Sequence, residues 1–310
     1  MAGKKMQGII PIMQTAFTAD GSGVDYEDME RMCDATVKDG SGAIALFGYA
    51  TEFFKLSDEE RAEMVRVCVK AVDGRIPVIA SITAGSTEVA VKTAKLYESL
   101  GADAVMVLSP SVVVPSTRQL VEHILEIGNS VGIASVIQYA PGAGGGALSP
   151  DSIKEICDRA KNELYIKAEP IPTAPFVDGI RRLTGDKVGI FTGNMGFFMV
   201  DLMERGATGF MPGVSLVPIY NEVFKAYMID GDRQRAEEIY NAMIPMVTII
   251  NQSLEILVKY EKMMLVKRGI IKSSYCRKPT AIEVDQKYWD AFCAHREKLK
   301  GITFVGDDYK

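Results

Sequence analysis

The chain of 310 residues has 47% hydrophobic and 24% charged residues, which is the composition of a folded globular protein and excludes a disordered chain. Its 35 basic and 40 acidic residues are dispersed along the sequence and leave a net charge of −5. A balance of this kind disfavours a nucleic acid or an anionic membrane as a partner.

Eight apolar runs of strand length succeed one another along the first two thirds of the chain. Several of them lack polar alternation, which is typical of parallel strands whose two faces are both covered by helices. The strands are expected at residues 8–17, 43–48, 77–82, 104–109, 134–140, 164–169, 188–194 and 207–213.

Amphipathic segments of helical length lie between these runs. One covers residues 26–38, and another begins at Ser57, which forms the sequence of a capping box with Glu60. Further helix starts are expected near Ser86 and at Ser149, which precedes a proline. After about residue 215 only helical patterns remain, at residues 217–229, 233–250, 254–268 and 284–299. We therefore expect a barrel domain over residues 1–225 and a helical bundle over residues 226–310.

Strands that alternate with helices are compatible with a closed (β/α)₈ barrel or with an open doubly wound sheet. A dinucleotide-binding sheet needs a GxGxxG turn after its first strand, whereas residues 15–18 read Thr-Ala-Phe-Thr. The glycine-rich segment 142–146 does not match a P-loop and is interpreted as a flexible loop. The pattern therefore favours an α/β protein with a (β/α)₈ TIM barrel and a C-terminal helical extension.

The numbers and spacing of the cysteines and histidines bear on the cellular compartment and on metal binding. The five cysteines are widely spaced and odd in number, which is typical of reduced thiols in a cytoplasmic protein. The only histidines, His123 and His295, lie outside any zinc-binding spacing, so neither a metal nor another cofactor is expected. No apolar run approaches the length of a membrane-spanning helix, and the short run 8–13 does not form a signal peptide.

The sixth expected strand carries a lysine, Lys167, inside an apolar run. Burying an amine is costly unless it is paired or functional. Desolvation favours the neutral amine, which can attack a carbonyl carbon to form a Schiff base, and the resulting iminium stabilises the carbanion of an aldol cleavage or dehydration. The alternative is a structural lysine whose head reaches solvent or pairs with Glu169.

Other polar residues fall at the carboxyl ends of the expected strands, where barrel enzymes place their active sites. Tyr139 ends the fifth run, where a phenol can pass a proton to a reaction intermediate; alternatively, it is a core tyrosine with a satisfied hydroxyl. The glycine-led turn after the second run can aim backbone N–H groups at a carboxylate, although an ordinary loop has the same pattern. The candidate substrate-binding residues at these ends are Tyr49, Ala50, Thr51, Glu169, Gly193, Asn194 and Pro212.

The order of these motifs resembles the dihydrodipicolinate synthase / N-acetylneuraminate lyase family over nearly the whole chain. The similarity is carried by segments 8–11, 48–52, 56–61 and 206–209 and by the spacing of Tyr139 and Lys167. This resemblance implies a Schiff base on Lys167, proton transfer by Tyr139 and a small 2-oxo acid as the substrate. It also implies a homo-oligomer, either a tetramer or a dimer.

Several segments depart from the family pattern. Residues 48–52 read Gly-Tyr-Ala-Thr-Glu, where the family usually has a glycine, two hydroxyl residues, a second glycine and a glutamate. Residues 110–113 read Pro-Ser-Val-Val where the synthases have Pro-Tyr-Tyr, and residues 140–145 lack the arginine that helps the synthases bind a dicarboxylic substrate or product. Glu169 stands where the sialic acid lyase normally has threonine.

These differences disfavour the synthase and the sialic acid lyase, and the sequence looks closer to dehydratases and aldolases of 2-keto-3-deoxy sugar acids. Glu169 would then serve as the acid or base for a departing hydroxyl. Two alternatives stay open. One is a 4-hydroxy-tetrahydrodipicolinate synthase that condenses pyruvate with aspartate semialdehyde, and the other is a catalytically silent barrel that binds a 2-oxo acid.

Overall fold

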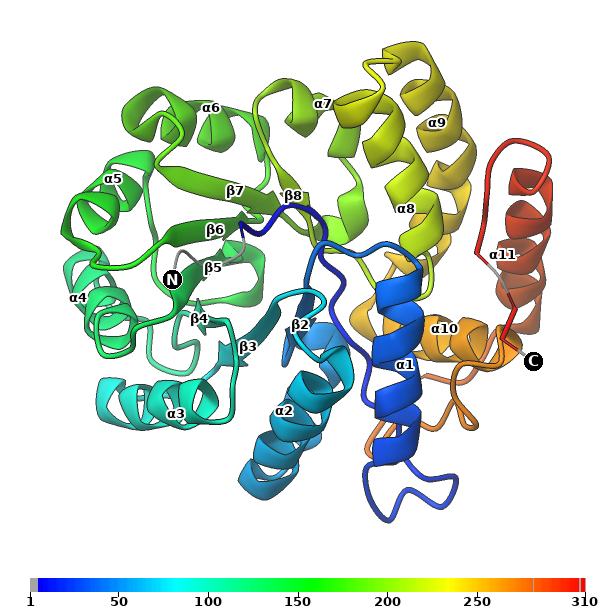
Figure 1. Ribbon diagram of the computed structural model, residues 1–310, viewed down its shortest axis with the longest axis horizontal. Helices are drawn as coiled ribbons and strands as arrows, with labels where there is room; N and C mark the ends of the chain where they lie inside the picture. Colours follow the sequence, from blue (N-terminus) through cyan, green and yellow to red (C-terminus); the bar gives the residue numbers. More distant parts are fainter. Residues whose placement is uncertain (1–4, 281, 307, 310) are drawn as a thin grey trace.

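The computed structural model describes residues 5–280, 282–306 and 308–309 and shows a (β/α)₈ barrel (Figure 1). Its eight strands are parallel and follow the order β1-β8-β7-β6-β5-β4-β3-β2. The ring closes beside β1, where Ile12 forms parallel bridges to Ala45 on one side and to Gly213 on the other. The fold predicted from the sequence is therefore confirmed.

Each strand lies within one of the eight predicted apolar runs, and β1 and β8 are the shortest because regular pairing there covers only two residues. The strands are β1 (Gly8–Ile9), β2 (Ile44–Leu46), β3 (Val78–Ile82), β4 (Ala104–Leu108), β5 (Ala134–Tyr139), β6 (Leu164–Ala168), β7 (Val188–Thr192) and β8 (Gly209–Phe210).

Helices connect the strands and surround the sheet (Figure 1). The predicted helix starts at Ser57, Ser86 and Ser149 are confirmed, because each of these side chains accepts a backbone hydrogen bond from the first turn. The helices are α1 (Tyr26–Lys38), α2 (Asp58–Val72), α3 (Thr87–Ser99), α4 (Thr117–Gly128), α5 (Pro150–Arg159), α6 (Ala174–Thr184), α7 (Met199–Glu204), α8 (Val217–Phe224), α9 (Arg233–Ile250), α10 (Leu254–Lys267) and α11 (Gln286–Leu299).

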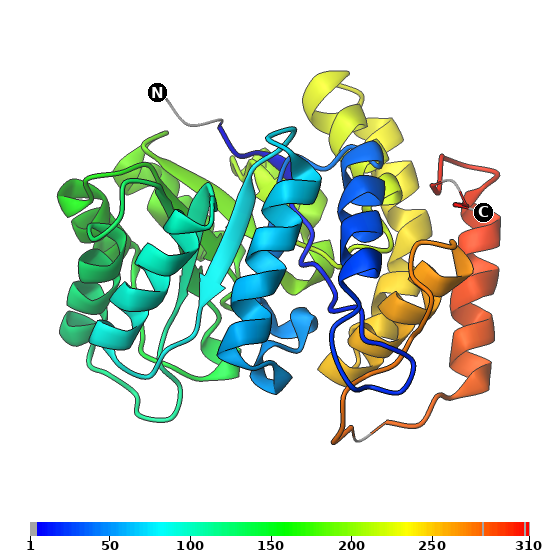
Figure 2. The same cartoon turned by 60° about the horizontal axis from the view of Figure 1, so that its bottom comes forward.

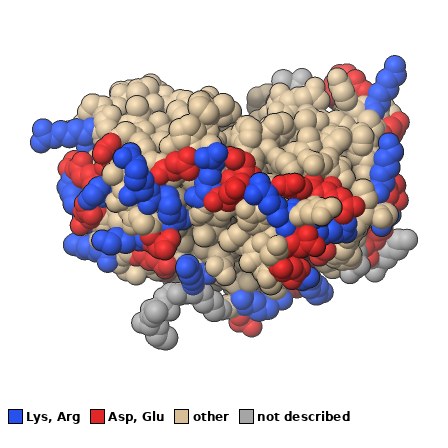
Figure 3. Space-filling model, turned by 90° about the horizontal axis from the view of Figure 1, so that it is seen from above, with Lys and Arg blue, Asp and Glu red and all other residues tan. Residues whose placement is uncertain are grey.

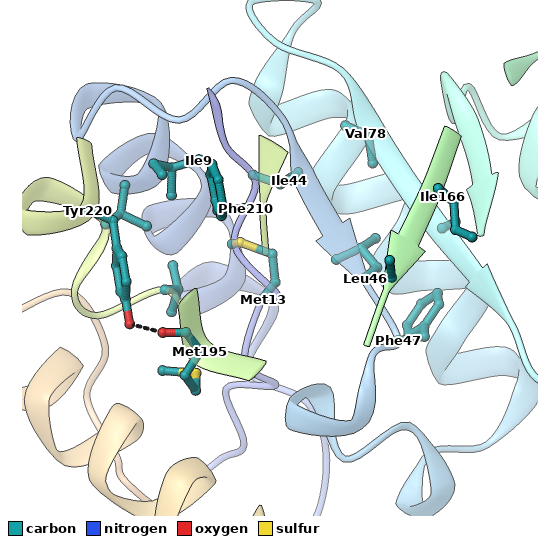
Figure 4. Close-up of a cluster of buried hydrophobic side chains, with 14 of the residues drawn as sticks. Ile9, Met13, Ile44, Leu46, Phe47, Val78, Ile166, Met195, Phe210 and Tyr220 are labelled. Atoms are coloured by element: carbon teal, nitrogen blue, oxygen red, sulfur yellow. Dashed lines mark hydrogen bonds between the residues drawn. The ribbon is translucent and has the colours of Figure 1, made fainter. Parts of the chain in front are cut away.

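Buried side chains form an inner layer inside the barrel and an outer layer between the strands and the helices. Strands β2 to β7 contribute to the inner layer, as do Ile10 and Met211 directly after β1 and β8. In this layer the rings of Tyr165 and Phe191 stack with centroids 4.8 Å apart. Gly189 leaves room for that stack, because a Cβ at this position would lie 2.1 Å from the Tyr165 ring. Figure 4 shows part of the outer layer, including Ile44 and Ile166. The alternation of inward and outward residues along each strand therefore decides which side chains reach the barrel interior.

The C-terminal helices lie at one side of the barrel, where α11 packs against α9 (Figures 1 and 2). Helix α10 also contacts the short 3₁₀ turn Tyr49–Thr51 that follows β2. The helical extension thus approaches the end of the barrel that is formed by the carboxyl ends of the strands. The division into domains at residues 225 and 226 stays a prediction.

Within the described residues, no single helix is long and apolar enough to cross a membrane; α9 and α10 together meet that test by length and composition only, with a bend of 117° between them. On the face shown in Figure 3, acidic and basic side chains are interspersed in a mixed band. This arrangement agrees with the dispersed charge of the sequence.

Candidate active site

Lys167 lies near the end of β6 and points into the barrel. Tyr165, two residues earlier, belongs to the inner layer, whereas Ile166 and Ala168 belong to the outer layer. Because side chains alternate along a strand, Lys167 shares the inward direction of Tyr165. Its side chain is buried, with 5% of the residue exposed. An amine in this position requires a partner.

That partner is Glu169, the residue directly after β6. The Lys167 Nζ atom lies 3.3 Å from Glu169 Oε2, and the Gln138 amide Nε2 donates to the same oxygen over 3.2 Å. The backbone N–H of Asn194 donates to the other oxygen, Oε1, over 3.3 Å. Donors on β5 and β6 and in the turn after β7 thus meet at one carboxylate and fix its orientation.

The turn after β7 is shaped to meet this carboxylate. Asn194 and Met195 both have left-handed backbones, with φ of 51° and 53°, a conformation that costs on the order of 1 kcal/mol or more for residues other than glycine. The Tyr220 hydroxyl on α8 donates to the Met195 carbonyl and holds the turn in place (Figure 4). A Cβ at Gly193 would lie 1.8 Å from Glu169 Oε1, so only glycine leaves space for the carboxylate.

Lys167 and Glu169 line a cavity of about 470 Å³ at the mouth of the barrel. A volume of this size accommodates a small organic acid. The remaining lining residues are Ile12, Tyr49, Ala50, Asn194, Met195, Met211, Pro212, Gly213, Asn251, Ser253, Leu254 and Leu257.

The predicted catalytic Lys167 lines this cavity, and so do most of the predicted substrate-binding residues, namely Tyr49, Ala50, Glu169, Asn194 and Pro212. Within the described part of the chain, Thr51 and Gly193 are not among the lining residues. The Thr51 hydroxyl instead donates to the Met13 carbonyl over 2.7 Å, which ties the turn after β2 to β1. Gly193 acts through the space that it leaves for Glu169. The roles of all these residues in binding stay predictions.

Sequence reasoning did not identify the part of the cavity wall that comes from the C-terminal extension. The turn between α9 and α10 contributes Asn251 and Ser253, and α10 contributes Leu254 and Leu257. The polar break between the two helical patterns marks this turn in the sequence. No sequence signal shows that it faces the barrel mouth, because that placement depends on packing between distant segments.

A buried ion pair between Glu52 and Lys262 stabilises the turn that carries Tyr49. Glu52, with a left-handed φ of 57°, is bound by Lys262 of α10 and lies 2.9 Å from Lys55 Nζ. Lys262 is fully buried, and this burial lowers the pKa of its amine. The Tyr49 phenol lies at the cavity, where partial burial raises its pKa and the negative charge of Glu169 adds a smaller increase. The Tyr49 side chain is therefore a neutral hydrogen-bonding group at neutral pH.

A second buried carboxyl group lies behind the cavity wall. Glu261 of α10 accepts the backbone N–H of Ser215 over 2.7 Å, and its carboxylate approaches Gly213, which lines the cavity. Complete burial raises the pKa of Glu261 from 4.5 to about 7. Glu261 therefore changes its charge near neutral pH.

Residues 5–295 match the model of the dihydrodipicolinate synthetase family. The chain belongs to this family. The L-2-keto-3-deoxyarabonate dehydratase of Azospirillum brasilense is 28% identical over 278 residues, which are 88% of each chain. The 4-hydroxy-tetrahydrodipicolinate synthase of Pelobacter propionicus is 27% identical over 240 residues, or 77% of this chain and 81% of that protein. The crystal structure of dihydrodipicolinate synthase from Rhodopseudomonas palustris has the same fold, with a TM-score of 0.86 at 24% identity over 95% of this chain and 99% of that one.

These comparisons confirm the family resemblance and the prediction that the chain is a lyase of the dihydrodipicolinate synthetase family. The family is a family of enzymes, and the named relatives are a dehydratase and a synthase.

Tyr139, the second residue predicted to be catalytic, is the last residue of β5. Tyr139 belongs to the outer layer, and its ring lies 5.0 Å from that of Phe176 on α6. Its Cα pairs with Ala168, whereas the Cα of Gln138 pairs with Lys167. The role of Tyr139 in proton transfer stays a prediction.

Proposed function

We propose that this family member is a class I lyase in which Lys167 forms a Schiff base with the C2 carbonyl of a 2-oxo acid. The observation that carries the proposal is a buried lysine, 5% exposed, whose amine borders a cavity of about 470 Å³ and lies 3.3 Å from a carboxylate. A lysine amine that borders a cavity can attack a carbonyl carbon, and a carboxylate within reach of that amine can act as the base that the attack needs.

The proposed chemistry uses Glu169 as the group that moves protons. Glu169 accepts a proton from the Lys167 ammonium, and the neutral amine adds to C2. The carbinolamine then loses its oxygen as water, and the iminium that remains acidifies the protons on C3. Glu169 removes a C3 proton and delivers a proton to the hydroxyl that departs from C4, so that the elimination releases one water molecule. Aldol cleavage would use the same iminium but would break the C3–C4 bond instead of the bond between C4 and its hydroxyl.

We propose a 2-keto-3-deoxy sugar acid as the substrate and dehydration as the reaction. The cavity offers neutral hydrogen-bonding groups on Asn194, Asn251 and Ser253, which suit the hydroxyl groups of such an acid. The dehydratase function named for the Azospirillum brasilense relative supports the same choice.

The second candidate is 4-hydroxy-tetrahydrodipicolinate synthase, which is the name of several relatives. That reaction joins pyruvate to aspartate semialdehyde, and its product carries two carboxylates. Among the described residues that line the cavity, Lys167 is the only cation, and there is no arginine to receive a second carboxylate. A coupled assay with pyruvate and aspartate semialdehyde separates the two candidates, and we expect no turnover.

We also propose that the protein is a cytoplasmic homo-oligomer, a tetramer or a dimer. All five cysteines are free thiols, which suits a reducing compartment. The loop after β4 exposes three consecutive valines, Val112, Val113 and Val114, with exposures of 98%, 77% and 62%. Such an apolar segment is typical of a surface that a partner covers. Light scattering coupled to gel filtration tests this proposal, and a monomer at all concentrations contradicts it.

The decisive test of the Schiff base is reductive trapping. We expect borohydride to fix pyruvate on the enzyme as a single adduct, and peptide mapping to locate that adduct on Lys167. Lys262, the other buried lysine among the described residues, serves as an internal control because it lies outside the cavity lining. The proposal fails if wild-type enzyme gives no adduct, or if the adduct forms on another lysine and Lys167→Arg keeps its turnover.

A further inference from the structure

The segment that follows β8 connects the cavity wall to helix α10. Gly213 lines the cavity, and two residues later the backbone of Ser215 is bound on both sides by charged side chains of α10. The Ser215 N–H donates to Glu261 Oε2 over 2.7 Å, and Nη1 of Arg268 donates to the Ser215 carbonyl over 3.3 Å. Glu261 and Arg268 are two helical turns apart and therefore lie on the same face of α10.

The same face of α10 supplies part of the cavity wall. Leu254 and Leu257 in the first turn of the helix line the cavity, and Glu261 and Arg268 follow them at helical spacing. The two contacts at Ser215 therefore help to fix how far α10 lies from the carboxyl end of β8. That distance sets the width of the cavity on the side of the extension.

Arg268 is held in one orientation by an ion pair with the end of α1. It is completely buried, and its Nη1 and Nη2 atoms lie 2.9 Å from the two carboxylate oxygens of Asp39. A bidentate contact of this kind fixes the plane of the guanidinium. The Nη1 atom that contacts Asp39 also donates to Ser215, so the ion pair aims the arginine at the segment after β8.

A short segment that follows α11 covers this arginine. We call it the strap; it comprises residues 305–306 and 308–309. The Tyr309 N–H donates to the Arg268 carbonyl over 2.5 Å, and the Tyr309 hydroxyl donates to Asp39 Oδ1 over 3.2 Å. The Tyr309 ring centre lies 5.5 Å from Arg268 Cζ, within the range of a cation–π contact. Tyr309 thus contacts both members of the ion pair.

The first residues of the strap approach the same guanidinium. Gly306 has a φ of 90°, and a Cβ at this position would lie 2.7 Å from Arg268 Nη2, so only glycine leaves room for the arginine. Arg296 of α11 donates over 3.2 Å to the carbonyl of Val305, directly before this glycine. The strap is therefore attached to the extension at one end and covers the arginine at the other.

We propose that Arg268 is a positioning residue for the wall of the cavity and that the strap holds it in place. This inference rests on the proposed Schiff-base function, because it concerns the part of the cavity that receives a 2-oxo acid beyond C3. Displacement of the strap lets α10 move away from β8. Lys167 on β6 keeps its position, whereas the distal part of a long substrate loses its contacts with the wall.

Borohydride trapping with two probes tests the proposal without knowledge of the natural substrate. Pyruvate reports on the amine of Lys167, whereas 2-oxohexanoate carries three more carbons that the rest of the cavity has to receive. Mass spectrometry gives the concentration of each probe at half-maximal adduct formation, and a thermal melt of each variant gives its stability.

The variants change the strap and not the cavity lining. Tyr309→Ala removes the ring and the hydroxyl, and Tyr309→Phe keeps the ring over the guanidinium. Gly306→Ala forces the strap away from Arg268. Gly301→Ala is the matched control, because the nearest atom listed around a Cβ at Gly301 is 3.5 Å away, an ordinary contact distance.

We expect Tyr309→Ala and Gly306→Ala to raise the half-maximal concentration of 2-oxohexanoate about 10-fold, which is the loss expected when about one methylene group loses its apolar contact. The value for pyruvate should stay within about twofold of wild type. Tyr309→Phe and Gly301→Ala should keep both values. A merely structural role of the strap would lower the melting temperature and leave the ratio of the two probes unchanged.

The outcomes separate the failure of this inference from the failure of the proposed function. If wild type traps pyruvate, the Schiff base stands. The positioning role is then wrong if wild type does not trap 2-oxohexanoate, if the variants keep the wild-type ratio of the two probes, or if Tyr309→Ala and Gly306→Ala do not fold at all. If wild type traps neither probe, the proposed function itself is wrong.

Discussion

Two buried lysine–glutamate pairs occupy the same end of the barrel and differ in what surrounds them. Lys262 is completely buried; it binds Glu52 and the Tyr275 carbonyl, and its Nζ lies 4.6 Å from the centre of the Phe17 ring. Lys167 is 3.3 Å from Glu169 and borders an open cavity. The amine of Lys262 is surrounded by protein groups, whereas the amine of Lys167 borders a cavity that a ligand can enter. Burial of a lysine is therefore not sufficient to indicate catalysis, and the open side is the informative feature.

The largest effect should come from replacing the lysine at the cavity. Lys167→Arg keeps a cation beside Glu169 but cannot form an imine, so we expect turnover on a 2-keto-3-deoxy acid to fall by about 10⁴-fold or more. The melting temperature should change little, because the ion pair is retained. Steady-state kinetics and a thermal melt on the same preparation measure both quantities. Substantial residual turnover would place the nucleophile elsewhere.

The structural lysine should show the opposite behaviour. Lys262→Met leaves Glu52 without its closest partner, and we expect the free energy of unfolding to fall by about 3 kcal/mol, with Lys55 limiting the loss. Removing the remaining charge in the double variant Lys262→Met/Glu52→Leu should recover most of that stability. Urea denaturation checks both values. An unchanged single variant would mean that this pair does not hold the turn.

Glu261, next to Lys262 on α10, extends the comparison to a buried acid. Its pKa is raised from 4.5 to about 7 by burial, so the folded chain holds this proton over a pH range in which the unfolded chain has released it. Stability is then highest below pH 4.5 and falls as the pH rises towards about 7, by about 3 kcal/mol for this group in total.

Glu261→Gln should remove this part of the pH dependence. The free energy of unfolding of the variant, measured relative to wild type, should therefore be higher at pH 8 than at pH 5. Denaturant unfolding at several pH values measures the difference. The exposed Glu126→Gln is the matched control and should leave the dependence unchanged. Parallel curves for wild type and Glu261→Gln would show that this carboxyl is ionised already at low pH.

The smallest effect on turnover is expected from filling the space beside Lys167 and Glu169. The added Cβ in Gly193→Ala would lie 1.8 Å from Glu169 Oε1 and 2.8 Å from Lys167 Cε, so the carboxylate must move. We expect turnover to fall about 10- to 100-fold, because displacements of this size misalign a catalytic group. Gly142→Ala is the control, since nothing lies within 4 Å of its Cβ position. Equal rates for the two variants would contradict the proposed role of Glu169.

The sequence predicted much of the lining of the site but not the neighbours of Lys167 on the adjacent strands. Lys167, Glu169 and Tyr49 were found because polar residues at the ends of apolar runs are visible without a structure. The residue of β5 opposite Lys167 was not visible, because a parallel strand covered on both faces shows no polar alternation from which its direction can be deduced. The register against β6 pairs Gln138 with Lys167.

The sequence by itself determined the order of eight strands and their helices, the family, and a lysine in an apolar strand. These features are local: they depend on periodicity, capping residues and the cost of burying an amine. Only the tertiary structure decided that Gln138 faces that lysine, that α10 closes the cavity, and that Glu52 pairs with a lysine 210 positions away. The physical reason is that contacts between distant segments are fixed by the closure of the barrel and the packing of the extension upon it, which no local pattern encodes.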